Sequence, residues 1–262
     1  MHYLKITDWK TLQDFLEDTV SSKRSRSDYF HFRGQSVFEW KLEPTLMRIV
    51  KGDPTSESKA EYYEKMTEFE FRSQFHLSNE GLSYQNDTPF THLMVDMQHY
   101  SCPTRLLDWS HSPYVGLYFS INENFNSNGA LYMWDYRIYN NKLETLNPGY
   151  KDIHPNELLK IKHYDFVTII MAIRKNQRIA KQQGCFTYSN SLIKAHCDMI
   201  LSIFEKNEPS GLIKLEIPFE LKFEFLERLK LMNISAGSLF PGLDGLGRSI
   251  KETLLLRRWS GG

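Results

Sequence analysis

The sequence predicts an α+β fold in which helices flank a central mixed or antiparallel sheet. Four short runs rich in β-branched and aromatic residues predict strands, over residues 29–33, 130–136, 167–172 and 212–217. Stretches with apolar residues three and four positions apart predict helices between them. Of the 262 residues, 41% are hydrophobic and 14% aromatic, which is enough for a packed core. The chain shows no internal repeat, low-complexity linker or Pro/Gly-rich hinge, so we expect one domain over residues 1–262.

The N-terminal elements follow from capping and backbone rules. Residues 1–19 predict a short strand and then a helix, with Asp8 as the expected N-cap. We expect a polar loop over residues 21–27 and then the strand over residues 29–33, ending at Gly34. Pro44 disfavours helix at the residue before it, so the preceding segment is expected to be extended.

Helical periodicity returns in the middle and at the end of the chain. The middle helices are expected over residues 55–75, 91–100 and 113–121, and the last of these is followed by an asparagine-rich loop over residues 122–129. Residues 55–75 bring a set of large apolar side chains near one face, Tyr62, Met66, Phe69 and Phe75. Two late helices are expected over residues 221–232 and 246–256.

Bulk composition excludes several classes of protein. Lysine plus arginine equals aspartate plus glutamate at 32 each, so no global field draws the chain to nucleic acid or to an anionic membrane. The three cysteines are odd in number and widely spaced, which favours a reducing compartment over a disulfide framework. No signal peptide is indicated, and no run approaches the roughly 20 apolar residues of a spanning helix. We therefore expect a cytoplasmic protein with no membrane partner.

Four polar clusters lie beside strong apolar runs, at residues 31–35, 98–100, 104–110 and 178–186. The sequence Met-Gln-His-Tyr at 97–100, with Pro-Thr-Arg-Leu-Leu-Asp-Trp-Ser at 103–110 and Phe-Arg-Gly-Gln at 32–35, strongly resembles the FRG-domain family. Blocks at residues 178–186 and 239–245 are similar to later elements of the same family. The resemblance covers about residues 29–250 in the family's order, and it departs at Ser101, where the family usually has glycine.

This resemblance implies a biological setting. FRG domains are found in bacterial proteins linked to phage defence and toxin-like systems. The expected partners are therefore a macromolecular target, either protein or nucleic acid, and an antitoxin or a phage protein.

A second pattern is similar to mono-ADP-ribosyltransferases, which cleave nicotinamide adenine dinucleotide (NAD). Those enzymes place an arginine at the end of an early strand, as at Arg33-Gly34, and then a Ser-x-Ser element before a helix and a strand, as at Ser110 and Ser112. A carboxylate or glutamine follows before a Gly-containing strand, as at Gln182 or Gln183 before Gly184. The similarity implies an ADP-ribosyltransferase-like sheet and NAD as substrate. Glutamine in place of the usual glutamate keeps the hydrogen bond but loses the charge that steadies an oxocarbenium-like centre.

These patterns define the expected site. Arginine binds phosphate oxygens in bidentate fashion, so Arg33 is expected to grip the dinucleotide. The expected catalytic residues are Arg33, His99, Ser110 and Gln182. The expected cofactor-binding residues are Arg33, Gln35, Gln98, Tyr100, Arg105 and Ser112.

Other interpretations of the same residues stay open. Arg33 and Arg105 are also interpretable as structural partners of Asp108 or Asp244, and His99 as a core histidine. The polar clusters also suit a non-catalytic module that senses or binds a nucleotide or nucleic acid, or a protein-interaction domain. No metal is expected, because the cysteines and histidines lack paired zinc-ligand spacing, and no Gly-x-Ser-x-Gly motif supports a hydrolase triad.

Overall fold

The computed structural model describes residues 1–21, 29–51, 56–78, 90–153, 155–158, 160–171 and 176–260. Within this part of the chain, seven strands form one sheet in the order β1-β7-β4-β2-β3-β6-β5. Their bounds are β1 His2–Lys5, β2 Phe30–Gln35, β3 Leu107–Ser110, β4 Gly129–Asp135, β5 Val167–Ile170, β6 Gly184–Ser189 and β7 Leu212–Ile217. The pair β1–β7 is parallel and every other pair is antiparallel. The predicted α+β class with a mixed, mostly antiparallel sheet is confirmed.

Helices alternate with the strands along the chain, and each helix predicted from the sequence overlaps an observed helix. Their bounds are α1 Trp9–Leu16, α2 Thr45–Val50, α3 Glu57–Ser78, α4 Phe90–His99, α5 Pro113–Ile121, α6 Tyr136–Leu146, α7 Pro155–Leu158, α8 Gln177–Lys181, α9 His196–Ser202, α10 Lys222–Leu231, α11 Ala236–Leu239 and α12 Gly242–Ser260. A π-helical turn, Glu17–Ser21, continues α1, and 3-10 turns cover Tyr150–Asp152 and Phe219–Leu221. No helix in the described ranges is both long enough and apolar enough to cross a membrane.

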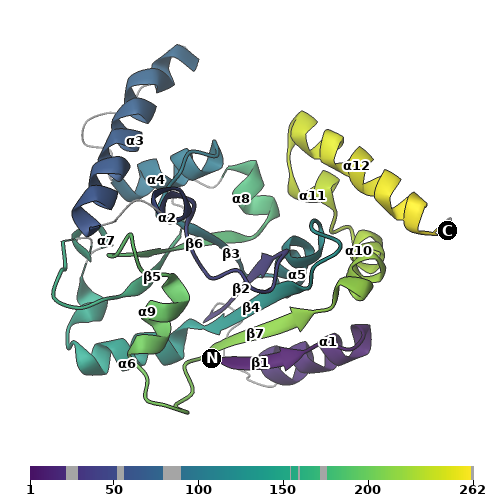
Figure 1. The fold of residues 1–262 in the computed structure, drawn as a ribbon, viewed down its shortest axis with the longest axis horizontal. Helices are drawn as coiled ribbons and strands as arrows, with labels where there is room; N and C mark the ends of the chain where they lie inside the picture. Colours follow the sequence, from purple (N-terminus) through teal and green to yellow (C-terminus); the bar gives the residue numbers. More distant parts are fainter. Residues whose placement is uncertain are drawn as a thin grey trace.

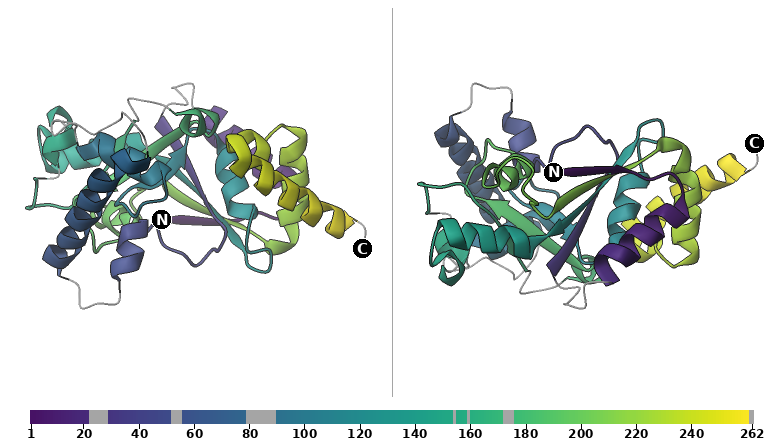
Figure 2. Two further views of the ribbon diagram at one scale, coloured as in Figure 1. Left: turned by 90° about the horizontal axis from the view of Figure 1, so that it is seen from above. Right: turned by 90° about the horizontal axis from the view of Figure 1, so that it is seen from below.

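Helices cover both faces of the sheet and create two apolar cores. One core combines Phe30 and Phe32 of β2 with α1, α5 and α10. The other combines Tyr132 and Trp134 of β4 with α4, α6 and α9. Figures 1 and 2 show α10, α11 and α12 gathered at one end of the molecule, with α3, α4 and α7 at the other. Strand β2 lies between the two groups, in the middle of the sheet.

The local sequence explains the best-defined helix starts. Asp8 caps α1, as predicted, because its side chain accepts a hydrogen bond from the Thr11 backbone N–H at 2.8 Å. Ser112 caps α5, and Pro113 occupies its first turn, where no backbone donor is needed. Helix α5 therefore begins and ends at the predicted residues.

Three expectations differ from the structure. Strand β2 does not end at Gly34 but continues to Gln35, since both residues pair with β4. Strands β3 and β6 lie inside segments that look like polar motifs in the sequence. The apolar residues expected on one face of α3 do not form a buried face, because Tyr62, Met66 and Phe69 are exposed. Beyond Ser21, the loop expected over residues 21–27 lies outside the described residues.

Candidate functional site

Two neighbouring cavities open beside β2, β3 and α8. The first has a volume of about 290 Å³ and the second about 250 Å³. Both are lined by Asp108 and Trp109 of β3, by Arg178 of α8 and by Gln182 just after it. Because these four residues belong to both linings, the cavities form one site with two lobes. We call them the first and second lobes.

The second lobe is rich in arginine. Arg33 of β2, Arg48 of α2, Arg178 of α8 and Arg248 of α12 all line it, against the carboxylates of Asp108 and Glu123. Five aromatic side chains line the same lobe, Phe32, Trp40, Trp109, Phe119 and Phe240. The guanidinium carbons of Arg178 and Arg248 lie 5.1 and 4.5 Å from the centre of the Phe240 ring. This aromatic side chain therefore orients two of the four guanidinium groups.

Arg33 is anchored to β3 through its neighbour Asp108. Its Nη1 donates to the Asp108 carbonyl oxygen at 2.6 Å and lies 3.8 Å from the Asp108 carboxylate. Burial lowers the pKa of the Arg33 guanidinium and the Asp108 charge opposes that shift. The Asp108 carboxylate is 57% exposed and also accepts from the Gln98 amide at 3.0 Å. Asp108 thus presents a fixed negative charge where the two lobes meet.

Three predicted site residues carry buried polar atoms with no hydrogen-bond partner within the described part of the chain. They are Arg33 at Nε, Gln35 at Oε1 and His99 at Nδ1. Arg33 and Gln35 line the second lobe, and His99 lines the first. Buried polar groups in folded proteins are nearly always satisfied by protein, water or ligand. These three atoms are therefore candidate positions for a hydrogen bond to water or to a bound molecule.

His99 is suited to accept a proton. Its desolvation, followed by the nearby Arg178 cation, lowers the pKa of the His99 imidazole. The ring is therefore neutral at pH 7, and His99 is not sealed in the core as the alternative interpretation requires.

Gln182 and Ser110 are linked to each other through the backbone. The Ser110 hydroxyl donates to the Gln182 carbonyl oxygen at 2.7 Å, and the Gln182 amide donates to the Leu239 carbonyl oxygen at 3.3 Å. Gln182 lines both lobes and Ser110 lines the second. Ser112 lines neither lobe, and its side chain caps α5.

Arg105 and Tyr100 lie outside both lobes. Arg105 is buried, donates from Nε to Glu64 at 2.6 Å and from Nη1 to the Ser189 carbonyl oxygen at 2.8 Å, and makes a second bond to Glu64 through Nη2. Every guanidinium nitrogen of Arg105 is therefore used to join β6 to α3. Tyr100 is exposed and its ring lies 6.4 Å from that of Phe71. The structure brings together Arg33, Gln35, Gln98, His99, Ser110 and Gln182, and leaves Arg105, Tyr100 and Ser112 apart.

Sequence reasoning missed three of the four arginines in the second lobe. Arg178 stands within the block at residues 178–186, so its position in a motif was the available signal, whereas Arg48 stands on α2, outside the blocks named above. Arg248 stands near the end of the resemblance, on a helix whose approach to β2 depends on the tertiary fold.

The comparison with protein families agrees with the central motifs. Residues 28–129 match the FRG domain model. The FRG match contains β2, β3 and α5, and with them Arg33, Gln98 and Asp108. It ends before α8 and α12, which supply Arg178 and Arg248. No curated protein and no solved structure matches the chain.

Proposed function

We propose that the two-lobed site binds NAD and catalyses ADP-ribosyl transfer to a macromolecule. One observation supports this most directly: Arg178 lies where the lobes meet, and Arg33, Arg48 and Arg248 line the second lobe. A dinucleotide consists of two nucleoside halves joined by a pyrophosphate. A cation at the junction suits the pyrophosphate, and a lobe on each side suits the two halves.

The aromatic residues of the second lobe favour the adenosine half there. Trp40 is 46% exposed, and its free ring area is available for base stacking. The first lobe, with Gln98, His99 and Asp108, then receives the nicotinamide riboside. Nucleotide binding by this combination of guanidinium groups and aromatic faces needs no glycine-rich phosphate loop.

The chemical step requires stabilisation of positive charge. In the proposed transfer, the bond from the ribose carbon to the nicotinamide nitrogen breaks and its electron pair leaves with nicotinamide. A nucleophile of the target then bonds to the ribose carbon and releases a proton. Asp108 supplies the carboxylate that Gln182 lacks, and its charge stabilises the oxocarbenium-like centre. Neutral His99 is assigned as the acceptor of the released proton.

The setting of this chemistry is part of the proposal. The acceptor is a protein or a nucleic acid, and the chain acts as an effector or toxin in a bacterial phage-defence system. An antitoxin or phage protein is the corresponding partner.

One observation favours a second candidate, a non-catalytic module that binds a nucleotide or nucleic acid. The Asp108 carboxylate is already bonded to Gln98 and paired with Arg33, and the Gln182 amide is bonded to Leu239. Groups fixed in this way suit recognition as well as catalysis.

Incubation with NAD separates the two candidates. We expect free nicotinamide and, with cell extract and labelled NAD, labelled macromolecules. Arg178→Gln should weaken NAD binding about 10- to 100-fold, because a charge-assisted hydrogen bond to phosphate contributes roughly 1.5–3 kcal/mol. Asp108→Asn should keep binding but lose nicotinamide release. Arg228→Gln is the matched control, since Arg228 lies on α10, pairs with Glu224 and lines neither lobe.

The outcomes are distinct. If the wild-type chain binds NAD but releases no nicotinamide, the result supports the non-catalytic binding module. Absence of both binding and turnover contradicts the NAD proposal itself.

A further inference from the structure

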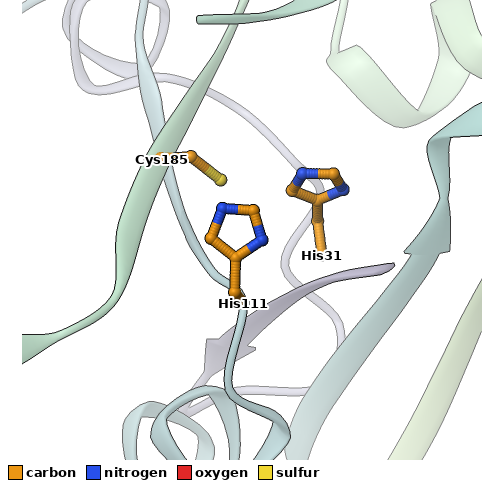
Figure 3. Close-up of side chains that lie close together, drawn as sticks. All are labelled: His31, His111 and Cys185. Carbon is orange, nitrogen blue, oxygen red and sulfur yellow. The ribbon is translucent and has the colours of Figure 1, made fainter. Parts of the chain in front are cut away.

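A second cluster of chemically active side chains lies beside the first lobe, which one of its members, Cys185, also lines. His31 of β2, His111 just after β3 and Cys185 of β6 each offer one ligand atom, and these atoms all lie within 4.8 Å of one another. Figure 3 shows the three side chains turned toward a common point, with the His111 ring between the other two in that view. His31 and Cys185 are buried and His111 is partly buried.

Sheet register explains why residues so far apart in sequence meet. Phe32 pairs with Ser110 in antiparallel β2 and β3, so the same register places His31 opposite His111. Their ring centres are 5.0 Å apart. The His111 backbone N–H donates to the Gln183 carbonyl oxygen at 3.0 Å, which extends the β3–β6 ladder by one residue and places Cys185 two residues along β6. The cluster is therefore built on three adjacent strands, a rigid support for a fixed geometry.

We propose that His31, His111 and Cys185 bind one Zn²⁺ ion. Imidazole nitrogen and thiolate sulfur are the ligands that zinc prefers, and a set of three protein ligands leaves one position for water. Binding displaces the proton of the Cys185 thiol to solvent and forms a Zn–S bond and two Zn–N bonds. Zinc binding is measured without NAD, so this site is tested separately from the proposed function.

The backbone fixes the orientation of the His31 ring, as it does at many zinc sites. The Tyr29 carbonyl oxygen lies 3.1 Å from His31 Nδ1. A carbonyl only accepts hydrogen bonds, so His31 carries its proton on Nδ1 and keeps a lone pair on Nε2 for the metal. Metal-binding histidines commonly have their second nitrogen fixed to a backbone carbonyl in this way.

The three ligand atoms must move closer together to bind one zinc ion. With Zn–S near 2.3 Å and Zn–N near 2.0 Å, tetrahedral ligand atoms lie roughly 3.5 Å apart. The strands hold the backbone positions, so this contraction must come from movement of the side chains. His111, as the least buried of the three, provides the approach for the ion.

Cobalt gives the most direct test. Untagged, chelator-treated full-length protein is titrated with Co²⁺, which gives strong visible bands in a tetrahedral site and near-ultraviolet charge transfer only when a thiolate binds. We expect the protein to bind one equivalent of Co²⁺ and to show both the visible bands and the charge-transfer band. Added Zn²⁺ should displace the cobalt and remove both signals. Cys185→Ser should remove the charge transfer, and His111→Asn should weaken metal binding about 100-fold or more, as expected for a direct ligand.

The chain supplies matched controls. Cys197→Ser removes another buried cysteine, and Cys102→Ser a partly exposed one, so both variants should keep the cobalt spectrum. A charge-transfer band that persists in Cys185→Ser, or no band in the wild-type protein, overturns the proposal. X-ray absorption on the zinc-loaded wild-type chain gives a decision without any variant. A zinc coordination shell that contains one sulfur and two histidine nitrogens supports the proposed site, and a coordination shell without sulfur contradicts it.

Discussion

A single buried histidine controls part of the acid stability. His196 is fully buried, its Nδ1 lies 3.1 Å from the Thr187 hydroxyl, and its Nε2 has no partner within the described ranges. Burial, and then the cations of Arg33 and Arg105, lower the pKa of His196 to about 3. The neutral ring is therefore the form that the folded protein accommodates.

The sign of the pH effect follows from this shift. In the unfolded chain His196 has an ordinary pKa near 6.5, so between about pH 3 and 6.5 the unfolded state binds more protons. The His196 contribution to the free energy of unfolding is complete above pH 6.5. It is lost as the pH falls toward 3, by up to about 1.4 kcal/mol per pH unit.

Urea unfolding between pH 7 and pH 4 measures this effect. We expect the free energy of unfolding of the wild-type chain to fall more steeply with acid than that of His196→Gln, whose amide keeps a bond to Thr187. If the free energies of unfolding of the wild type and the variant fall equally with pH, the assignment of this effect to His196 is wrong. If the variant does not fold, an NMR titration of the wild-type imidazole replaces the comparison, and titration of that ring near pH 6.5 contradicts it.

The sequence identifies single site residues where a motif fixes them. Arg33, Gln98 and Gln182 line the two lobes, because motif position and strand direction determine where their side chains go. Of the open structural pairings, that of Arg33 with Asp108 is present, whereas Asp244 pairs with Arg248. Arg105 meets Glu64, which stands 41 residues earlier on α3. That pairing depends on tertiary packing, so motif position alone did not predict it.

At the scale of elements, the contact between β2 and α5 determines which residue can follow Arg33. A Cβ atom added at Gly34 would lie 2.0 Å from the Gly116 carbonyl oxygen and 2.4 Å from the Ser120 backbone nitrogen. Both neighbours are backbone atoms of α5, so relief requires the helix to move away from the strand. Gly34 is required here by close approach of two backbones.

We therefore expect Gly34→Ala to lower the free energy of unfolding by about 3 kcal/mol or more, as in an overpacked core. Urea denaturation of the purified variant measures the loss. Gly247→Ala is the matched control, because an added Cβ meets nothing within 4 Å on α12. Its expected change is a gain of roughly 0.5–1 kcal/mol from helix propensity. Equal stabilities for the two variants would falsify the close-packing argument.

Helices and strands were predicted from the sequence where capping residues or a long periodic pattern marked them. Helix α5 has a serine cap and a proline in its first turn, and its bounds match the prediction. Strand β3 has only four residues, and although they alternate between apolar and polar, a run this short does not by itself distinguish a strand from a polar loop motif. Its strand character comes from pairing with β2 and β6, which no local pattern contains.

At the scale of the whole molecule, the site depends on segments from nearly the full length of the chain. Arg33 comes from β2, Arg178 from α8 and Arg248 from α12. The first two lie on motif blocks, whereas the approach of α12 to β2 follows from the sheet order and the helix packing beside it. This convergence explains why the polar clusters were predictable one by one and their common cavity was not.

The same convergence predicts how the FRG-matched segment behaves alone. Residues 28–129 contain β2, β3 and the first residue of β4, and they lack β1, β5, β6 and β7. Within this segment β2 and β3 are joined by the single pair Phe32–Ser110, whereas β2 makes six pairs with β4 in the full chain. Two short strands with so little pairing cannot form a stable sheet without further strands.

We expect the fragment 28–129 to show no cooperative transition in urea, while the full chain unfolds cooperatively under the same conditions. Circular dichroism follows both transitions, and the full chain serves as the reference for slope and midpoint. A cooperative transition in the fragment would mean that the segment folds by itself, and the strands outside it would then be additions to a complete core. Restoring β4 alone, in a fragment 28–135, tests the cause: it adds the β2–β4 ladder but not β6 or β7, and we expect it to remain unfolded because both faces of the sheet still lack most of their apolar cover.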